Sequence, residues 1–259
     1  MSAHAYPLVW ITGASKGIGR ALAIRFARAG STVAASARSA DALAVLARDA
    51  ESLPGRVVPL PLDVTDAAAV AAALGNLIDA EGLPDLVVMN AGTHIPVDGM
   101  SPTSADFKAL LDLNVMGTVH VLEAVVPRMV ARRAGRLAIV ASIAGYRGLR
   151  TASAYGASKA ALINMSEALR VELADAGVVL QLVNPGFVDT PLTEENEFPM
   201  PFLMSADKAA ERFYRGLHSS RFEITFPKRF TWILKALRLL PYCLYLPLAG
   251  AAARQRPKG

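Results

Sequence analysis

Short apolar runs alternate with stretches of helical pattern along most of this 259-residue chain. The runs have the length of buried strands, and the stretches between them are long enough to form helices that cross from one parallel strand to the next. Such alternation is typical of a parallel sheet covered by helices on both faces. The expected strands span residues 8–11, 32–36, 57–62, 86–89, 136–141 and 178–183. The sequence therefore predicts a doubly wound α/β fold with three layers, in which a helix over 17–29 follows the first strand.

Charge divides the chain near residue 220. Residues 221–259 hold 8 of the 27 basic and 1 of the 22 acidic side chains, a net charge of +7, which leaves −2 for residues 1–220. No linker or repeat interrupts the first part. We therefore expect one Rossmann-like domain over residues 1–220 and an amphipathic, helical extension over 221–259. The hydrophobic fraction of 53% excludes a disordered chain.

Several other classes of protein are excluded. The single cysteine, Cys243, cannot form an internal disulfide, and no group of Cys and His residues has the spacing of a metal site. Residues 1–7 lack the basic and apolar regions of a signal peptide. The longest uncharged stretch, 239–253, is too short and too often interrupted by proline to span a membrane, which takes about 20 apolar residues. We expect a cytoplasmic protein without a metal ion.

A glycine-rich turn follows the first expected strand and opens the first helix, with the sequence Thr12-Gly13-Ala14-Ser15-Lys16-Gly17-Ile18-Gly19. Glycines permit a tight turn and let the backbone approach a pyrophosphate, while the start of the helix favours negative charge. A turn of this kind also occurs without any ligand. Its place in the first strand-helix unit favours the binding of a dinucleotide.

The end of the second strand bears on which dinucleotide is bound. NAD-binding folds usually carry an acidic residue there for the ribose 2′-hydroxyl, but this chain has Ala35-Ser36-Ala37-Arg38. The guanidinium of Arg38, together with Lys16, can hold a 2′-phosphate. These residues favour NADP(H) over NAD(H); the alternative is that Arg38 is an ordinary solvated cation.

A tyrosine and a lysine stand four residues apart in Tyr155-Gly156-Ala157-Ser158-Lys159. On a helix these two side chains share a face, so the lysine charge is expected to lower the pKa of the phenol and suit it to acid-base catalysis. An exposed helix face has the same pattern. Ser142 follows the fifth expected strand, at the sheet edge where such folds bind ligands.

In this order, the motifs resemble those of the short-chain dehydrogenase/reductase superfamily, over about residues 7–215. Asp63-Val64 matches the pair that contacts adenine in the family, and Asn90-Ala91-Gly92 matches a turn that stabilises the sheet. Met89 departs from the family, which often has a second Asn at that position. The resemblance implies that Asn114 holds a water linked to Lys159, and that residues 185–190 (Pro185-Gly186-Phe187-Val188-Asp189-Thr190) hold the nicotinamide.

The resemblance and the residues together predict an NADPH-dependent oxidoreductase that interconverts a carbonyl and a secondary alcohol. Tyr155 would be the general acid or base, Ser142 would orient the substrate oxygen, and Lys159 and Asn114 would complete the proton relay. The alternative is a non-catalytic NADP(H)-binding sensor or scaffold. The expected cofactor contacts are Gly13, Ser15, Lys16, Gly17, Ile18, Gly19, Arg38, Asp63, Val64, Asn90, Ala91, Gly92, Tyr155, Lys159, Pro185, Gly186, Val188 and Thr190.

Two segments bear on partners. Residues 191–204 include Phe198, Phe202 and two Met residues, which favours either an apolar substrate beneath a lid or simple packing on the core. The resemblance also implies a homodimer or homotetramer formed through residues 105–133 and 152–174.

In residues 228–240, Lys228, Thr231, Lys235 and Arg238 form a narrow stripe beside a broad apolar face. This pattern fits peripheral membrane contact through residues 228–249, and equally a helix packed on the substrate entrance or on a second subunit with its cations in water. Nucleic acid is not expected as a partner, because large aliphatic residues separate the cations.

Overall fold

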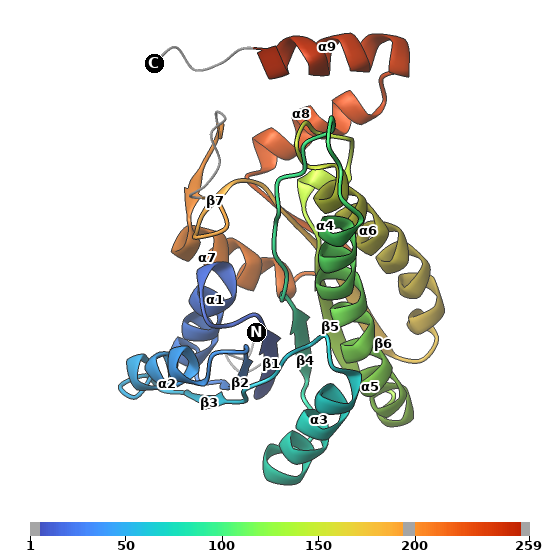
Figure 1. Ribbon diagram of the computed structural model, residues 1–259. Helices are drawn as coiled ribbons and strands as arrows, with labels where there is room; N and C mark the ends of the chain where they lie inside the picture. The colour runs from blue at the N-terminus through green and yellow to red at the C-terminus, as the bar shows by residue number, and fades with distance from the viewer. Residues whose placement is uncertain (1–5, 194–199, 255–259) are drawn as a thin grey trace.

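The computed structural model describes residues 6–193 and 200–254 (Figure 1). Within them, seven strands form one parallel sheet in the order β3-β2-β1-β4-β5-β6-β9. The strands are β1 (Leu8–Thr12), β2 (Thr32–Ser36), β3 (Arg56–Pro59), β4 (Leu86–Met89), β5 (Gly135–Val140), β6 (Val178–Pro185) and β9 (Glu223–Phe226). The order reverses between β1 and β4, and the crevice at such a reversal is where doubly wound sheets bind ligands.

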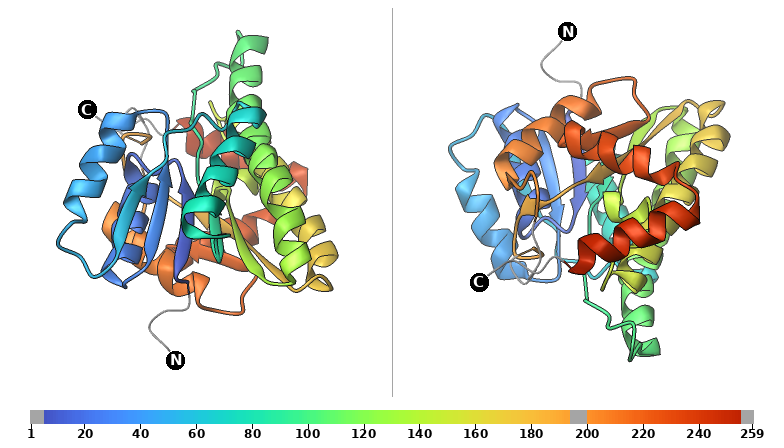
Figure 2. Two further views of the ribbon diagram at one scale, coloured as in Figure 1. Left: turned by 90° about the horizontal axis from the view of Figure 1, so that it is seen from below. Right: turned by 90° about the horizontal axis from the view of Figure 1, so that it is seen from above.

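Helices cover both faces of this sheet and give the three predicted layers (Figure 2). One face packs against α1 (Gly17–Arg28), α2 (Ala40–Asp49) and α7 (Ala206–Leu217). The other packs against α3 (Ala67–Glu81), α5 (Gly117–Arg132) and α6 (Ser153–Ala174). Adjacent strand residues point to opposite layers, so Val9 and Ile11 belong to the first core and Trp10 to the second.

The helix α4 (Ser104–Leu110) continues through a π-helical segment, η1 (Leu111–Met116), into α5. By length and composition alone, the run from Ser104 to Arg132 could span a membrane. In the fold, however, Val121, Val125 and Met129 of α5 are buried in the core against the sheet. The run is therefore a covering helix of the sheet.

The six predicted strands are all present, with small differences at their ends. The third ends at Pro59 rather than residue 62, and the sixth continues to Pro185. Strand β9, which pairs with β6, is not among the predicted strands. The boundary expected after residue 220 falls just before this strand, so the sheet takes in part of the expected extension.

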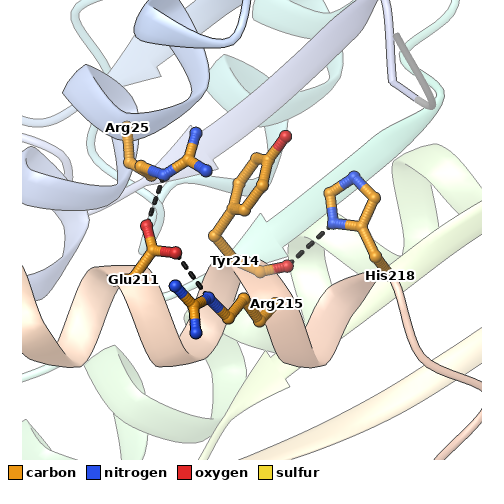
Figure 3. A network of polar contacts seen from close by, with 5 residues as sticks. All are labelled: Arg25, Glu211, Tyr214, Arg215 and His218. Carbon is orange, nitrogen blue, oxygen red and sulfur yellow. Dashed lines mark hydrogen bonds and ion pairs between the residues drawn. The ribbon is translucent and has the colours of Figure 1, made fainter. Parts of the chain in front are cut away.

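The helix α7 is fixed to α1 by polar contacts as well as by its apolar face. Ser205 caps α7 by accepting a hydrogen bond from Lys208 N, as its sequence position indicates. Glu211 of α7 accepts a hydrogen bond from Arg25 Nε of α1 at 2.6 Å, and the Arg25 guanidinium lies 3.7 Å from the centroid of the Tyr214 ring (Figure 3). These contacts attach the segment after residue 204 firmly to the first core.

Two further helices, α8 (Lys228–Arg238) and α9 (Tyr242–Arg254), follow β9. In Figure 1 and in the right-hand view of Figure 2 they lie together at one end of the molecule, toward which the loop after β4 rises. This is the end at which the parallel strands finish. A short parallel pair, β7 (Val188–Asp189) and β8 (Met204–Ser205), brackets the segment between them.

Candidate active site

The glycine turn after β1 lines a cavity of about 210 Å³ at the carboxyl edge of the sheet. Gly13 and Gly17 have positive φ angles of 67° and 57°, which few other residues adopt. A Cβ atom on Gly19 would lie only 2.3 Å from the carbonyl oxygen of Gly13, so this glycine allows helix α1 to pack on the turn. The backbone at the start of α1 thus faces the cavity, where an anionic group is favoured.

Asn90 joins the glycine turn to the neighbouring strand. Its Nδ2 atom donates hydrogen bonds to the carbonyl oxygens of Thr12 and Gly13, over 3.1 and 3.0 Å. The hydroxyl of Thr12 in turn accepts hydrogen bonds from the backbone N–H groups of Asn90 and Ala91. The ends of β1 and β4 are therefore held together at the point where the strand order reverses.

Arg38 and Lys16 both line this cavity, as does Asp63 after β3. The pKa of Asp63 lies below its usual value, mainly because the backbone N–H of Thr65 donates to the carboxylate, with a smaller contribution from the charge of Arg38. Arg38 is thus near a carboxylate as well as the cavity. Two cations and one carboxylate therefore line the same cavity.

Ser142 follows β5 at the same edge and precedes a short helical turn, η2 (Ile143–Gly145). Its Oγ atom accepts a hydrogen bond from Ala144 N over 3.1 Å. The turn packs tightly on α6, because a Cβ atom on Gly145 would lie 2.7 Å from the backbone carbon of Lys159. The serine is therefore held at a fixed position relative to the helix that carries Tyr155 and Lys159.

Tyr155 and Lys159 lie on one face of α6, as their spacing predicts. The Lys159 Nζ atom is 5.7 Å from the centroid of the Tyr155 ring and donates a hydrogen bond to the carbonyl of Val140 over 3.1 Å. Burial lowers the pKa of Lys159 to about 8. Burial also raises the pKa of Tyr155, against the opposing effect of Ser142. The expected lowering of the Tyr155 pKa is therefore wrong for this structure, in which desolvation outweighs the hydrogen bond with Ser142.

Asn114 is fully buried in the π-helical segment η1. Its Oδ1 atom accepts a hydrogen bond from Thr93 N at 2.8 Å, and its Nδ2 atom donates to Thr93 O and to Ser158 Oγ, each at 3.0 Å. Gly92 lies against both Asn114 and Lys159, since a Cβ atom on Gly92 would be 2.9 Å from Asn114 Oδ1 and 3.4 Å from Lys159 Nζ. The structure thus brings Asn114 next to Lys159; π-helical turns of this kind are frequent at functional sites.

A family model described as short chain dehydrogenase matches residues 7–199. The chain belongs to the short-chain dehydrogenase family. An uncharacterized oxidoreductase of Myxococcus xanthus is 39% identical over 98% of this chain and 99% of its own length. A 3-oxoacyl-acyl-carrier-protein reductase of Thermotoga maritima is 36% identical over 71% of this chain and 75% of its own.

Solved structures agree with this assignment. A 3-oxoacyl-acyl-carrier-protein reductase of Brucella melitensis, solved with bound NAD, aligns with a TM-score of 0.76 at 27% identity over 86% of this chain and 90% of its own. This short-chain dehydrogenase is therefore an oxidoreductase that depends on NAD(P). The residues around the cavity fit such a cofactor, because the helix start, the glycine turn and two cations meet there.

The expected cofactor contacts of this family member divide into two groups. Most line the cavity, namely Gly13, Ser15, Lys16, Gly17, Ile18, Arg38, Asp63, Val64, Asn90, Ala91, Gly92 and Thr190. The others, Gly19, Tyr155, Lys159, Pro185, Gly186 and Val188, lie outside its lining. Thr190 does meet the glycine turn, since its Cγ2 atom would be 3.1 Å from a Cβ atom on Gly17. Residues 194–199 of the expected lid, including Phe198, lie outside the described residues.

Sequence reasoning missed His94, which packs edge-on against Tyr155 with 4.8 Å between the ring centroids. Burial lowers the pKa of His94, which favours its neutral form. It also missed Thr93 and Leu113, which line the cavity. His94 stands two residues after the Asn-Ala-Gly turn, and that position was the one signal that could have drawn attention to it.

Proposed function

We propose that this chain is an NADPH-dependent carbonyl reductase in which Tyr155 exchanges the proton with the substrate oxygen. The observation that supports this most is the meeting of Ser142, Tyr155, Lys159 and Asn114 at one edge of the sheet, beside the cavity lined by the glycine turn. A non-catalytic cofactor sensor would have no use for this combination of proton donors.

The geometry accounts for reduction in the following way. The cofactor, when bound, supplies the hydride. Tyr155 is protonated at neutral pH, as a phenol ordinarily is, and burial raises its pKa further, so it carries the proton that the developing alkoxide takes up. Ser142 holds the same oxygen by a hydrogen bond. Lys159, with a pKa of about 8, would pass a proton to Tyr155 and recover one from solvent through a water held by Asn114.

The cavity supports NADP(H) as the preferred cofactor. Arg38 after β2 and Lys16 in the glycine turn both line the cavity, and the segment Ser36-Ala37-Arg38 offers no acidic side chain to a ribose hydroxyl. A 2′-phosphate placed there would accept charge-assisted hydrogen bonds from the guanidinium. The fold itself does not decide between the two cofactors, because the Brucella reductase with bound NAD shares it. The proposed preference for NADP(H) therefore rests on the affinity that these two cations give to a 2′-phosphate.

An apolar carbonyl compound is the substrate class that the surroundings favour. The segment between β7 and β8 contains apolar side chains that are each more than a third exposed, namely Leu192, Phe202 and Leu203. Phe230 of α8 stacks on Phe187, with 5.6 Å between the ring centroids. An apolar chain or ring can pack among such side chains, and a relative of this protein is named for its 3-oxoacyl substrate.

The same family membership supports a cytoplasmic homo-oligomer. Met116 and Val171, in the helical segments expected at the subunit interface, are 43% and 75% exposed, although both are large and apolar. A second copy packed on these two helical segments would cover them. Light scattering of the full chain tests the assembly, and Val171→Asp is expected to shift it toward the monomer.

A screen of apolar ketones and aldehydes for oxidation of NADPH and of NADH tests the activity. We expect turnover with NADPH, and a loss of at least about 100-fold in kcat for Tyr155→Phe with cofactor affinity retained. Tyr214→Phe is the matched control, since Tyr214 stacks under Arg25 away from the site. Retained turnover in Tyr155→Phe would contradict the assignment. Cofactor binding without turnover by the native chain would favour the non-catalytic alternative.

A further inference from the structure

The helices α8 and α9 expose an unusual amount of apolar surface. The large apolar side chains concerned range from 50% exposed at Ile233 to 86% at Leu239. They are Trp232, Ile233, Leu239, Tyr242, Leu244, Leu246 and Leu248. Large apolar side chains exposed together on neighbouring elements mark interaction sites. We call these seven residues the α8–α9 surface.

The outward position of this surface follows from the rotation of α8 about its axis. The centre of the polar stripe faces the sheet: Thr231 is 2% exposed, and Lys235 forms an ion pair with Glu223 of β9. Glu223 also accepts hydrogen bonds from Tyr146 and Asn184. With Lys235 held by the half-buried carboxylate and Phe230 and Leu234 packed on the core, the remaining apolar side chains of α8, Trp232, Ile233 and Leu239, point outward.

A second set of contacts fixes the turn between the two helices to the loop after Ser142. Arg147 donates hydrogen bonds to the carbonyl oxygens of Arg238 and Leu240, over 2.7 and 3.0 Å. Its guanidinium also lies 4.2 Å from the centroid of the Tyr245 ring, and the Tyr245 hydroxyl donates to Gly148 O at 2.7 Å. The α8–α9 surface is therefore built into the fold beside the active-site loop.

The charges around this surface identify what it binds. Lys228, Arg229 and Arg238 are exposed on α8, and residues 224–259 contain no acidic residue. A partner must therefore be both apolar and negatively charged. A second copy docking by the same face would bring these cations against each other, and a nucleic acid would offer nothing to the leucines. An anionic lipid bilayer meets both needs, and Trp and Tyr are the aromatic residues that favour its interface.

We propose that the α8–α9 surface docks this protein on bilayers that contain anionic phospholipids. The apolar side chains enter the region between headgroups and acyl chains, while the cations contact phosphate. Phe230 of α8 contacts Phe187 and Phe202, so docking brings the bilayer next to the apolar side of the site. If the proposed function holds, apolar substrates reach the site from the membrane; the docking itself does not depend on that function.

Vesicle flotation of the full chain tests the proposal, using phosphatidylcholine with and without phosphatidylglycerol. We expect binding only with the anionic lipid. Trp232→Ser combined with Leu239→Ser should weaken it at least about tenfold, because each side chain gives up its burial in lipid. Met100→Ser combined with Val45→Ser, which changes exposed apolar residues elsewhere, should bind normally. Circular dichroism checks that every variant is folded.

A second variant tests the contribution of the cations separately from that of the apolar side chains. Lys228→Gln, Arg229→Gln and Arg238→Gln together should abolish the dependence on anionic lipid and weaken flotation about tenfold or more. Normal flotation of the Trp232/Leu239 variant would overturn the proposal, and so would a change in oligomeric state instead of in lipid binding. Reduction of a water-soluble ketone should be unchanged in all these variants, so loss of docking and failure of the proposed function give different results.

Discussion

The ammonium of Lys159 lies over the ring of Tyr155, 5.7 Å from its centroid, at a position where the lysine is only 4% exposed. Burial has moved the pKa of Lys159 from 10.5 to about 8. A shift of this size means that holding the lysine charged near pH 7 costs the fold about 3 kcal/mol. The site thus keeps a charge that the proposed mechanism needs at the expense of stability.

Replacing Lys159 by methionine should therefore stabilise the protein while removing its activity. Near pH 7 we expect Lys159→Met to raise the free energy of unfolding by about 1–3 kcal/mol. The unfolded chain holds this proton up to about pH 10.5 and the folded chain only up to about pH 8, so the native protein gains stability as pH rises between the two values. The advantage of the variant should shrink over that range.

Urea unfolding without cofactor at several pH values measures this difference. Lys208→Met is the matched control, because Lys208 is exposed and its charge is solvated. A Lys159→Met protein that is less stable than the native one near pH 7 would show that the ammonium contributes more through its hydrogen bond to Val140 than burial takes away.

Arg38 should decide between the two cofactors. Arg38→Gln removes the charge facing the cavity, and we expect it to raise the KM for NADPH about 10- to 100-fold with little change for NADH. Arg20→Gln serves as the control, since Arg20 also lies near the glycine turn but pairs with Asp49. Equal changes in the KM for NADPH and for NADH would show that Arg38 contributes to cofactor binding in general or to folding, and that it does not recognise a 2′-phosphate.

Asn114 should affect catalysis beyond its effect on stability. Asn114→Ala leaves Thr93 N without its partner and Ser158 Oγ with only its bond to the carbonyl of Tyr155, which should cost about 1–3 kcal/mol of unfolding free energy. Ser158→Ala removes one of the same hydrogen bonds but not the amide beside Lys159. We expect kcat to fall at least about tenfold in Asn114→Ala, with a changed pH profile, and to stay near normal in Ser158→Ala. Parallel losses in both variants would mean that Asn114 acts only through packing.

Most of the fold and the core of the site could be predicted because their signals are local. A buried parallel strand needs a short apolar run, a glycine turn needs its glycines, and Tyr155 and Lys159 need only helical spacing to share a face. The order of strands then brings Ser142, which follows β5, to the same edge. The strands, the glycine turn and the shared helix face are thus each predicted from residues that are close together in the sequence.

What could not be predicted depends on residues distant in sequence. Strand β9 has four residues and begins with Glu223, whose carboxylate is satisfied by Tyr146, 77 positions earlier. The rotation of α8 depends on the ion pair between Lys235 and that same carboxylate. The raised pKa of Tyr155 likewise comes from burial by the whole fold, which the spacing of two residues does not reveal.

Glu223 should therefore hold α8 in place. Burial alone would raise the pKa of Glu223, but hydrogen bonds from Lys235, Tyr146 and Asn184 outweigh it, so the pKa lies below its usual value. We expect Glu223→Gln to cost about 1–3 kcal/mol of unfolding free energy near pH 7. A carboxylate with a lowered pKa stabilises the fold above its ordinary pKa and loses this effect as pH falls through the folded value. The difference between the native and variant proteins should accordingly shrink on acidification.

Hydrogen exchange then shows where the stability is lost. In Glu223→Gln we expect faster exchange in α8 and α9, because the helix loses the contact that fixes its rotation, while β1 and β4 at the centre of the sheet stay protected. Lys235→Met removes the other partner of the same ion pair and should give the same pattern. The exposed pair of Lys108 and Asp112 provides the control, since Asp112→Asn should change neither stability nor exchange by much. Unchanged exchange in α8 after both substitutions would show that the helix is held by its apolar contacts and by Arg147 alone.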